Sequence, residues 1–320
     1  MAVRSLVCAV DFSNGSRTAL RYAAVVSTLI DAQLVVLTVN DALLVDAARA
    51  SGRGNWPETQ AYKDLRSFCA ATLSAAASPT FLVRVGRPAE TILEVARELG
   101  ASLVVMGVQG LTGLRKSFFG SIAERVLRDT TVPVLVTPTD CHAPGSREDL
   151  TAVVRRVIVP VDLSPASTPQ ARIASVIGSA LRVPVLLLHA IEPLSMPLKW
   201  RAQLPSVDME RRMRAEATME QVRADAGIPA AEAIVAFGEP SEEIGKAASA
   251  RGAGLVVMGL HASGTARVGS VTYRVLSLAR VPVLALPAAA VARAEDDGRA
   301  PAGASRLMTC RNGSFEFLYL

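Results

Sequence analysis

The sequence contains an internal repeat, which constrains the possible fold more than any other feature of the chain. Residues 3–16 read VRSLVCAVDFSNGS and residues 154–167 read VRRVIVPVDLSPAS, so that Asp11 corresponds to Asp162. Three pairs of segments match in the same order, namely 3–16 with 154–167, 86–107 with 238–259, and 120–138 with 269–287. The repeat predicts two tandem domains of the same fold.

Each copy alternates short apolar runs with segments of helical periodicity. In the first copy we expect strands at 5–10, 34–39, 80–85, 103–106 and 134–136, and helices at 16–30, 58–77, 88–99 and 121–128. Ser13 or Asn14 as a helix cap, Pro88 at a helix start and Gly100 after a helix end support these boundaries. Alternating strands and helices with right-handed crossovers predict an α/β fold, with two tandem doubly wound parallel sheets of five strands each, Rossmann-like in type.

The repeat also predicts the domain boundaries. We expect a first domain at 1–140, a linker at 141–153 that is polar and interrupted by Pro144 and Gly145, and a second domain at 154–288. From 289 to 320 the repeat ends, and we expect a flexible C-terminal tail.

Charge and hydropathy exclude several classes of protein. The net charge of +5 comes from scattered arginines, and the densest group, at 211–214, is interleaved with acidic residues, so we expect no nucleic-acid binding. No run of about 18 uncharged apolar residues is present, and no secretion signal precedes Asp11. The sequence therefore predicts a cytoplasmic protein that is not embedded in a membrane.

The four cysteines lie far apart. Cys8, Cys69, Cys141 and Cys310 show no CxxC spacing, so neither a zinc site nor a disulfide framework is indicated, and we expect free thiols.

Two features of the first copy point to a ligand site. Asp11 follows the first expected strand, and a glycine-containing loop begins at Gly107 after the fourth. Ligands of open α/β sheets bind beyond the carboxyl ends of the strands where the strand order reverses. If these strands are neighbours, Asp11 can hold ribose or a cation while loop amides and the following helix start bind phosphate. The alternative is that Asp11 caps the first helix.

The loop itself can be compared with two phosphate-binding patterns. GLTGLRKS, from Gly110, differs from a Walker A motif because Arg115 replaces its second glycine, which argues against a P-loop. The spacing from Gly107 to Gly110, and then across nine residues to Gly120 and Ser121, is G-x2-G-x9-G-S.

This last spacing resembles that of nucleotide-binding members of the universal stress protein family. VDFS around Asp11, the G-x-P at 86–88 and VPV at 132–134 extend the resemblance over 3–138, and it repeats over 154–287. The resemblance implies an adenine nucleotide alpha hydrolase-like fold and bound ATP, with or without Mg²⁺, the metal being left open. It implies contacts with the nucleotide from Ala9, Asp11, Ser13, Val39, Met106, Gly107, Gly110, Arg115, Gly120, Ser121 and Ile122.

The second copy departs from this pattern. Ala262 replaces the glycine that corresponds to Gly110, and the span from Gly259 to Gly269 is three residues shorter than in the first copy. A Cβ at this position obstructs close approach of the backbone, so we expect this site to be weak or empty. His261 in this loop is interpreted as structural, whereas His189 at a strand end fits a functional role and a packed core position equally well.

No catalytic group is evident in the first loop, and only three histidines are present in the chain. We therefore expect an ATP-binding stress-response regulator or sensor that acts on an unidentified protein partner. A slow ATPase or nucleotide-transfer enzyme, and a nucleotide-free interaction module, are the alternatives. The expected fifth strands match between the copies, and the resemblance to the family implies that they pair to form an internal pseudo-dimer of the two domains, with a homodimer of the whole chain as a further arrangement.

Overall fold

The computed structural model describes residues 4–51, 56–74, 77–108, 120–194, 204–260 and 270–298. Its contacts divide the chain into two compact units, with the division between Val153 and Val154. We refer to these as the first and the second unit. Among the described residues, no helix is both long and apolar enough to cross a membrane.

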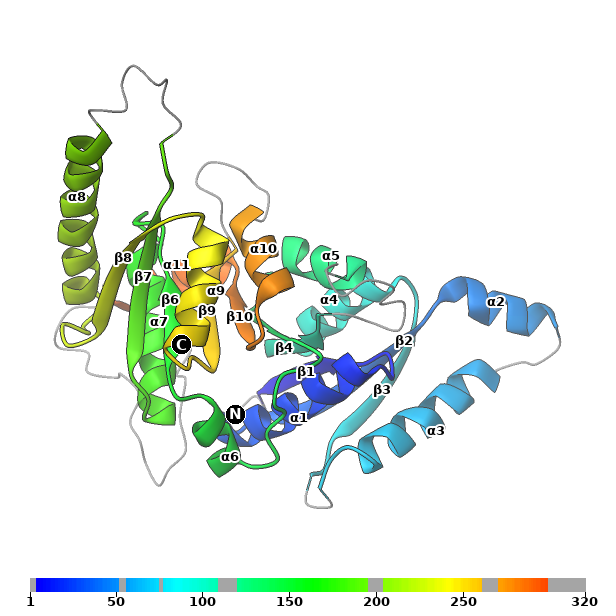
Figure 1. Cartoon of the computed structure of the whole chain (residues 1–320). Helices are drawn as coiled ribbons and strands as arrows, with labels where there is room; N and C mark the ends of the chain where they lie inside the picture. The colour runs from blue at the N-terminus through cyan, green and yellow to red at the C-terminus, as the bar shows by residue number, and fades with distance from the viewer. Residues whose placement is uncertain are drawn as a thin grey trace. The chain divides into compact units, whose positions relative to one another are not determined.

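The first unit is a parallel sheet with helices on both faces (Figure 1). The strand order is β3-β2-β1-β4-β5. Because the crossovers to β2 and β3 run in one direction and those to β4 and β5 in the other, right-handed connections place α1 and α3 on one face and α4 and α5 on the other. The elements are β1 (Ser5–Ala9), α1 (Asn14–Leu29), β2 (Gln33–Asn40), α2 (Ala42–Ala50), α3 (Trp56–Ala70), β3 (Thr80–Val85), α4 (Pro88–Glu98), β4 (Ala101–Gly107), α5 (Ser121–Asp129), β5 (Val134–Thr137) and α6 (Arg147–Val153).

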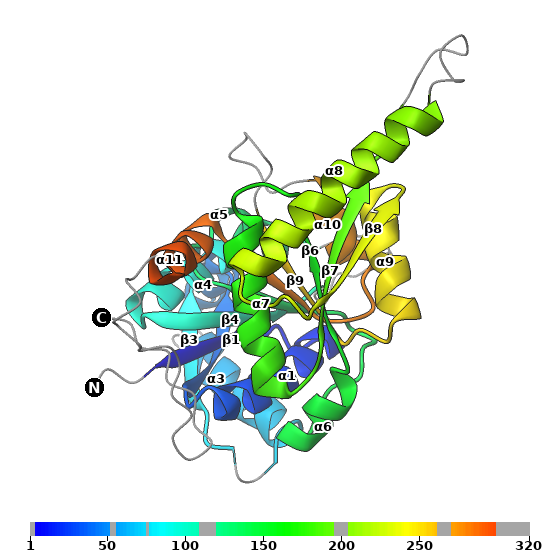
Figure 2. The same ribbon diagram turned by 90° about the vertical axis from the view of Figure 1, so that its left-hand side faces the viewer.

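The second unit repeats this topology with the strand order β10-β9-β6-β7-β8. Its longest described helix, α8, lies across β7 and β8 (Figure 2). The elements are β6 (Val157–Pro160), α7 (Ser167–Leu181), β7 (Val185–Ile191), α8 (Leu204–Asp225), β8 (Glu232–Phe237), α9 (Pro240–Ala250), β9 (Leu255–Gly259), α10 (Ser270–Leu278), β10 (Val283–Leu286) and α11 (Ala288–Gly298). The prediction of two doubly wound, five-stranded parallel sheets is confirmed.

The predicted helix boundaries in the first unit have identifiable causes. Ser13 is the N-cap of α1, and its hydroxyl accepts a hydrogen bond from the Ser16 amide at 3.1 Å. Pro88 is the first residue of α4, where a missing amide hydrogen costs nothing. Gly100 follows α4 with a φ of +55°, a conformation that glycine adopts without strain.

Three short helices were not predicted from the sequence. Asp41 caps α2 by accepting a hydrogen bond from the Leu43 amide at 2.8 Å. The expected linker contains α6, where the Ser146 hydroxyl accepts a hydrogen bond from the Asp149 amide at 3.1 Å. The segment expected to begin the flexible tail forms α11, which packs against α7 and buries Val291. Each helix gains stability from a cap or a tertiary contact rather than from a long periodic sequence.

The three cysteines among the described residues are free thiols, and Cys8 and Cys69 are buried. Burial raises the pKa of Cys69 and of Cys141 to about 11 and raises that of Cys8 still more. At pH 8 we expect iodoacetamide to modify all three at least about a hundredfold more slowly in the native protein than in urea, because the thiolate is the reactive form. Mass spectrometry of the labelled peptides measures each site, and rapid native labelling of Cys69 would contradict the burial of that thiol.

Candidate functional site

The predicted crevice lies at the carboxyl ends of β1 and β4. β1 pairs in parallel with β2 on one side and with β4 on the other, so the strand order reverses at β1. The neighbouring strands assumed in the sequence analysis are therefore present. Asp11 follows β1 and Gly107 ends β4, which brings both residues to the same edge of the sheet.

A hydrogen-bonded turn holds Asp11. Its Oδ1 accepts a hydrogen bond from the Ser13 amide at 3.1 Å and a second, very short one from the Ser16 hydroxyl. The Asp11 amide in turn donates to the Ser16 hydroxyl at 3.1 Å. Ser13, and not Asp11, is thus the helix cap, while Asp11 organises the turn before it. The carboxylate is half-buried at the edge of the sheet.

The same turn recurs in the second unit. Asp162 Oδ1 accepts hydrogen bonds from the Ser164 amide at 3.0 Å and from the Ser167 hydroxyl at 3.2 Å. The residue after each aspartate has a left-handed backbone, with φ of +66° at Phe12 and +62° at Leu163. Sequence reasoning missed this feature, because neither Phe nor Leu indicates positive φ.

Gly107 is in close contact with the start of α1. A Cβ built on Gly107 would lie 2.8 Å from the carbonyl carbon of Gly15 and 3.2 Å from its Cα. The glycine at the end of β4 is therefore required for packing, whatever it contributes to a ligand. It lets the end of β4 and the first turn of α1 approach without a side chain between them.

The loop between Gly107 and α5 is described only at its two ends. Gly110 and Arg115 lie outside the described residues. The Gly120 amide donates to the Val108 carbonyl at 3.0 Å, so the ends of the loop meet beside the sheet. Gly120 is the N-cap of α5 and supplies no side-chain cap, while Ser121 and Ile122 are exposed in the first turn of this helix. A helix start of this kind presents amide donors that suit an anion.

The remaining predicted site residues lie on the same three strand ends. Ala9 ends β1, Met106 is the buried penultimate residue of β4, and Val39 is half-buried near the end of β2. Together with Asp11 and Ser13 they follow or end the three adjacent strands β2, β1 and β4. The structure thus brings the described members of the predicted set to one edge of the first sheet.

The second unit differs at the corresponding point of its sheet. Pro160 replaces Ala9 and has no amide hydrogen, and the pairing of β6 with β9 is limited to Val157 and Ile158. The buried amide of Gln170 donates to the Pro160 carbonyl at 2.7 Å and to the Val257 carbonyl at 3.0 Å. A side chain therefore bridges the strands where the backbone ladder stops. The sequence signal was a glutamine where the first copy has Ala19, and it was overlooked.

The charges beside this edge also differ between the units. Glu239 caps α9, and its carboxylate accepts from Arg274 Nη1 on α10 at 3.0 Å. Hydrogen bonds from the Ser241 hydroxyl and the Glu242 amide, together with Arg274, hold the pKa of Glu239 below its usual value. The corresponding residues of the first unit are Arg87 and Arg125. In the first unit Arg87 instead pairs with Glu90 of α4 at 3.3 Å, so the interhelix ion pair of the second unit is not repeated there.

The histidines are described in part. His189 is half-buried, and its Nδ1 is 2.9 Å from the Val161 carbonyl, which fits the structural interpretation. His142 is exposed, and its Nε2 is 3.1 Å from Asp149 Oδ1. His261 lies outside the described residues. Within the described ranges, no group of three or more histidine, cysteine or acidic side chains is arranged to hold a metal ion.

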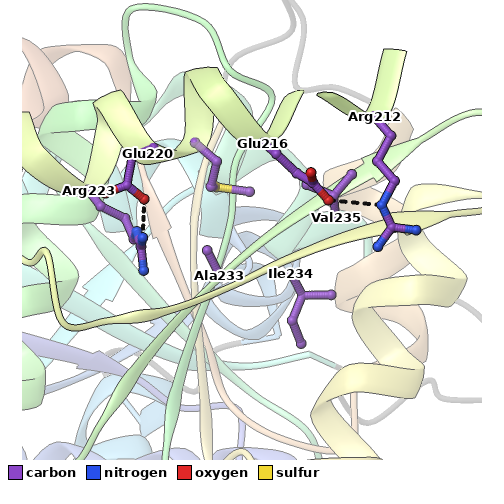
Figure 3. Close-up of a pocket in the computed structure, with 8 residues that line it drawn as sticks. Arg212, Glu216, Glu220, Arg223, Ala233, Ile234 and Val235 are labelled. Carbon is purple, nitrogen blue, oxygen red and sulfur yellow. Dashed lines mark hydrogen bonds and ion pairs between the residues drawn. The ribbon is translucent and has the colours of Figure 1, made fainter. Parts of the chain in front are cut away.

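The second unit also has a groove of about 300 Å³ between α8 and β8 (Figure 3). Its rim carries two ion pairs within α8, Arg212 with Glu216 and Arg223 with Glu220, and Met219 also lines it. Because these charges are already paired along one helix, the groove has the character of a packing gap beside an edge strand. It is separate from the strand ends that form the candidate site.

Known proteins share both the sequence pattern and the fold. The Universal stress protein family profile matches residues 2–138 and 154–287. A universal stress protein of Methanocaldococcus jannaschii is 49% identical over 51 residues, which is 16% of this chain and 30% of that protein. One of Mycobacterium tuberculosis is 28% identical over 214 residues, which is 62% of this chain and 65% of that protein. The chain thus aligns with less than two thirds of the length of either relative.

Solved structures agree on the fold. A Pseudomonas aeruginosa protein of unknown function superposes with a TM-score of 0.63 at 16% identity, covering 93% of this chain and 97% of its own. A universal stress protein of Archaeoglobus fulgidus gives a TM-score of 0.54 at 20% identity, covering 88% and 98%. The family profile covers both units and most of the sequence. The chain therefore belongs to the universal stress protein family.

Proposed function

We propose that the first unit binds ATP in the crevice between the carboxyl ends of β1 and β4, and that occupancy of this site regulates a protein partner in a stress response. One observation carries the proposal: Asp11 follows β1 and α5 follows β4, and these two strands are neighbours in the sheet. Two other universal stress proteins have been solved as complexes with cAMP and dAMP. The proposal rests on this chain's own residues.

The described residues fit a nucleotide in three ways. The half-buried Asp11 offers an acceptor for ribose hydroxyls or a site for a phosphate-bound cation. The first turn of α5, which Gly120 leaves without a side-chain cap, offers donors for phosphate oxygens. Half-buried Val39 at the end of β2 offers an apolar surface for adenine. ATP would bind through these groups, with or without a divalent cation.

The repeat provides a matched test of this assignment. We expect Asp11→Asn to weaken ATP binding at least tenfold, a loss of about 1.4 kcal/mol, because the negative charge is removed while the turn keeps its acceptor. Asp162→Asn makes the same change in the second unit, and we expect it to leave the affinity unchanged. Isothermal titration calorimetry measures both constants and the stoichiometry, which we expect to be one ATP per chain.

Two outcomes would count against the proposal. Equal losses of ATP affinity in Asp11→Asn and Asp162→Asn would show that the two units do not differ in binding. Unchanged affinity in Asp11→Asn would show that Asp11 is not part of the site. Mass spectrometry of small molecules released by denaturation identifies any nucleotide that copurifies. Single-turnover hydrolysis that is lost in Asp11→Asn while ATP still binds would reassign the chain as a slow ATPase.

A further inference from the structure

Phe12 has a strained backbone at the proposed site. Its φ of +66° lies in the left-handed region, which costs a non-glycine residue about 1–3 kcal/mol and is an outlier for a bulky side chain. Such a conformation persists only where the surroundings enforce it. The Ser13 amide and the Ser16 hydroxyl, which donate to Asp11 Oδ1, follow Phe12 in the chain, so the Phe12 backbone determines where these donors lie relative to the carboxylate.

The hydrogen bonds of the turn provide part of the restraint. The Asp11 side chain accepts hydrogen bonds from the Ser13 amide and the Ser16 hydroxyl. Both bonds therefore connect the residue before Phe12 with residues after it. The second unit has the equivalent bonds to Asp162 around Leu163. The bonds are thus common to both units and accompany a left-handed Leu163 in the second, so any additional restraint in the first unit must come from another contact.

A ring contact is added in the first unit. The rings of Phe12 and of Phe68 on α3 form an edge-to-face pair, with 5.6 Å between ring centroids and 83° between ring planes. Phe68 is 7% exposed. Edge-to-face pairs of this geometry contribute about 0.5–1.5 kcal/mol beyond burial, which is comparable to the backbone cost at Phe12.

Phe68 is itself fixed between two helices. The Arg17 guanidinium of α1 lies 4.7 Å from the centre of the Phe68 ring. Arg17 Nη1 donates to the Thr72 hydroxyl at 2.9 Å, and that hydroxyl donates to the Phe68 carbonyl at 2.7 Å. These contacts link α1 to Phe68, and Phe68 in turn contacts Phe12, which directly precedes the N-cap of α1.

The contacts among Phe12, Phe68 and Arg17 have no equivalent in the second unit's sequence. Leu163 replaces Phe12, Thr168 replaces Arg17, and α8, which follows the second strand as α3 does, contains no aromatic residue. We propose that Phe68 is a positioning residue, which adds to the turn bonds in holding Phe12 left-handed and thereby fixes the Asp11 carboxylate at the crevice. This inference rests on the proposed function, because ATP binding is its main readout.

The test is a double-mutant cycle with ATP as the ligand. Phe68→Leu keeps an apolar side chain but removes the ring contact, and we expect it to weaken ATP binding at least threefold. Phe12→Gly adopts positive φ without help, so we expect it to bind within about twofold of the natural chain. In the Phe12→Gly background, Phe68→Leu should have no further effect. That rescue is the result that a merely structural role would not produce.

A second aromatic pair of the same unit supplies the control. Tyr62 on α3 meets Phe81 on β3 edge-on, with 6.1 Å between centroids and 86° between planes. Phe81→Leu removes a similar contact from the same helix, and we expect ATP affinity to stay unchanged. A loss equal to that of Phe68→Leu would overturn the positioning role, as would an equal loss from Phe68→Leu in both backgrounds at residue 12.

The cycle also separates this inference from the proposed function. If ATP does not bind the natural chain, the proposed function and the positioning of Asp11 toward ATP both fail. Urea unfolding without ligand then tests whether Phe68 restrains Phe12. Non-additive shifts of the unfolding midpoint for Phe12→Gly and Phe68→Leu would support a restraint of Phe12 by Phe68. Additive shifts would overturn it even where ATP binds.

Discussion

Gly107→Ala is expected to destabilise the first unit by about 3 kcal/mol. The added methyl group would lie 2.8 Å from the carbonyl carbon of Gly15, and that neighbour is backbone, which cannot rotate away as a side chain can. Overpacking of a fixed interior contact costs about 1–3 kcal/mol, and the rigid neighbour places this change at the upper end. Native-state hydrogen exchange measures the loss separately for the amides of each unit.

Gly245 provides the matched control. It lies within α9, and a Cβ there meets no described atom within 4 Å. Gly245→Ala is therefore expected to stabilise the second unit by about 0.5–1 kcal/mol, because alanine loses less backbone entropy in a helix. If Gly107→Ala were as harmless as Gly245→Ala, the close approach of β4 to α1 would be incorrect.

Gln170→Leu is expected to destabilise the second unit by about 2–3 kcal/mol. The buried amide donates to the carbonyls of Pro160 and Val257, at the point where Pro160 interrupts the ladder between β6 and β9. Leucine fills a similar volume but donates no hydrogen bond, and loss of a buried donor costs about 1–3 kcal/mol, here at the upper end because two carbonyls lose it. Hydrogen exchange of the β6 and β9 amides reports this loss directly.

A surface glutamine separates hydrogen bonding from a general effect of the substitution. Gln221 donates to Asp225 at 2.7 Å on the exposed face of α8, so Gln221→Leu should change stability by no more than about 0.5 kcal/mol. Equal effects at 170 and 221 would show that the Gln170 bridge contributes little. In that case Pro160 alone would account for the short pairing of β6 with β9.

The repeat predicted the topology because the same order of motifs had to satisfy the same sheet twice. The site prediction required the first and fourth strands to be neighbours without establishing it, and the pairing of β1 with β4 meets that condition. The capping role of Ser13 was also predictable, since a hydroxyl before an apolar periodic segment has few other uses. These features depend on local sequence and on handedness.

The missed features depend on contacts between residues far apart in the chain. Nothing beside Phe12 in the sequence indicates that Phe68 supports a left-handed backbone there. Gln170 appears as one polar residue in a helix until its two strand carbonyls are known. Helix α11 was missed because burial of Val291 against α7 supports it rather than a periodic pattern. Gly110 and Arg115 stay predictions.

The helices that follow β5 and β10 determine where this chain can be divided for separate expression. α6 packs on α1 and α11 packs on α7. Thr18 and Tyr22 of α1 donate their hydroxyls to the carbonyls of Thr139 and His142, beyond the end of the family match at residue 138. A fragment ending at 138 would lose both acceptors and uncover one side of α1. The contacts divide the chain after Val153, so the first compact unit extends beyond the segment that the family profile matches.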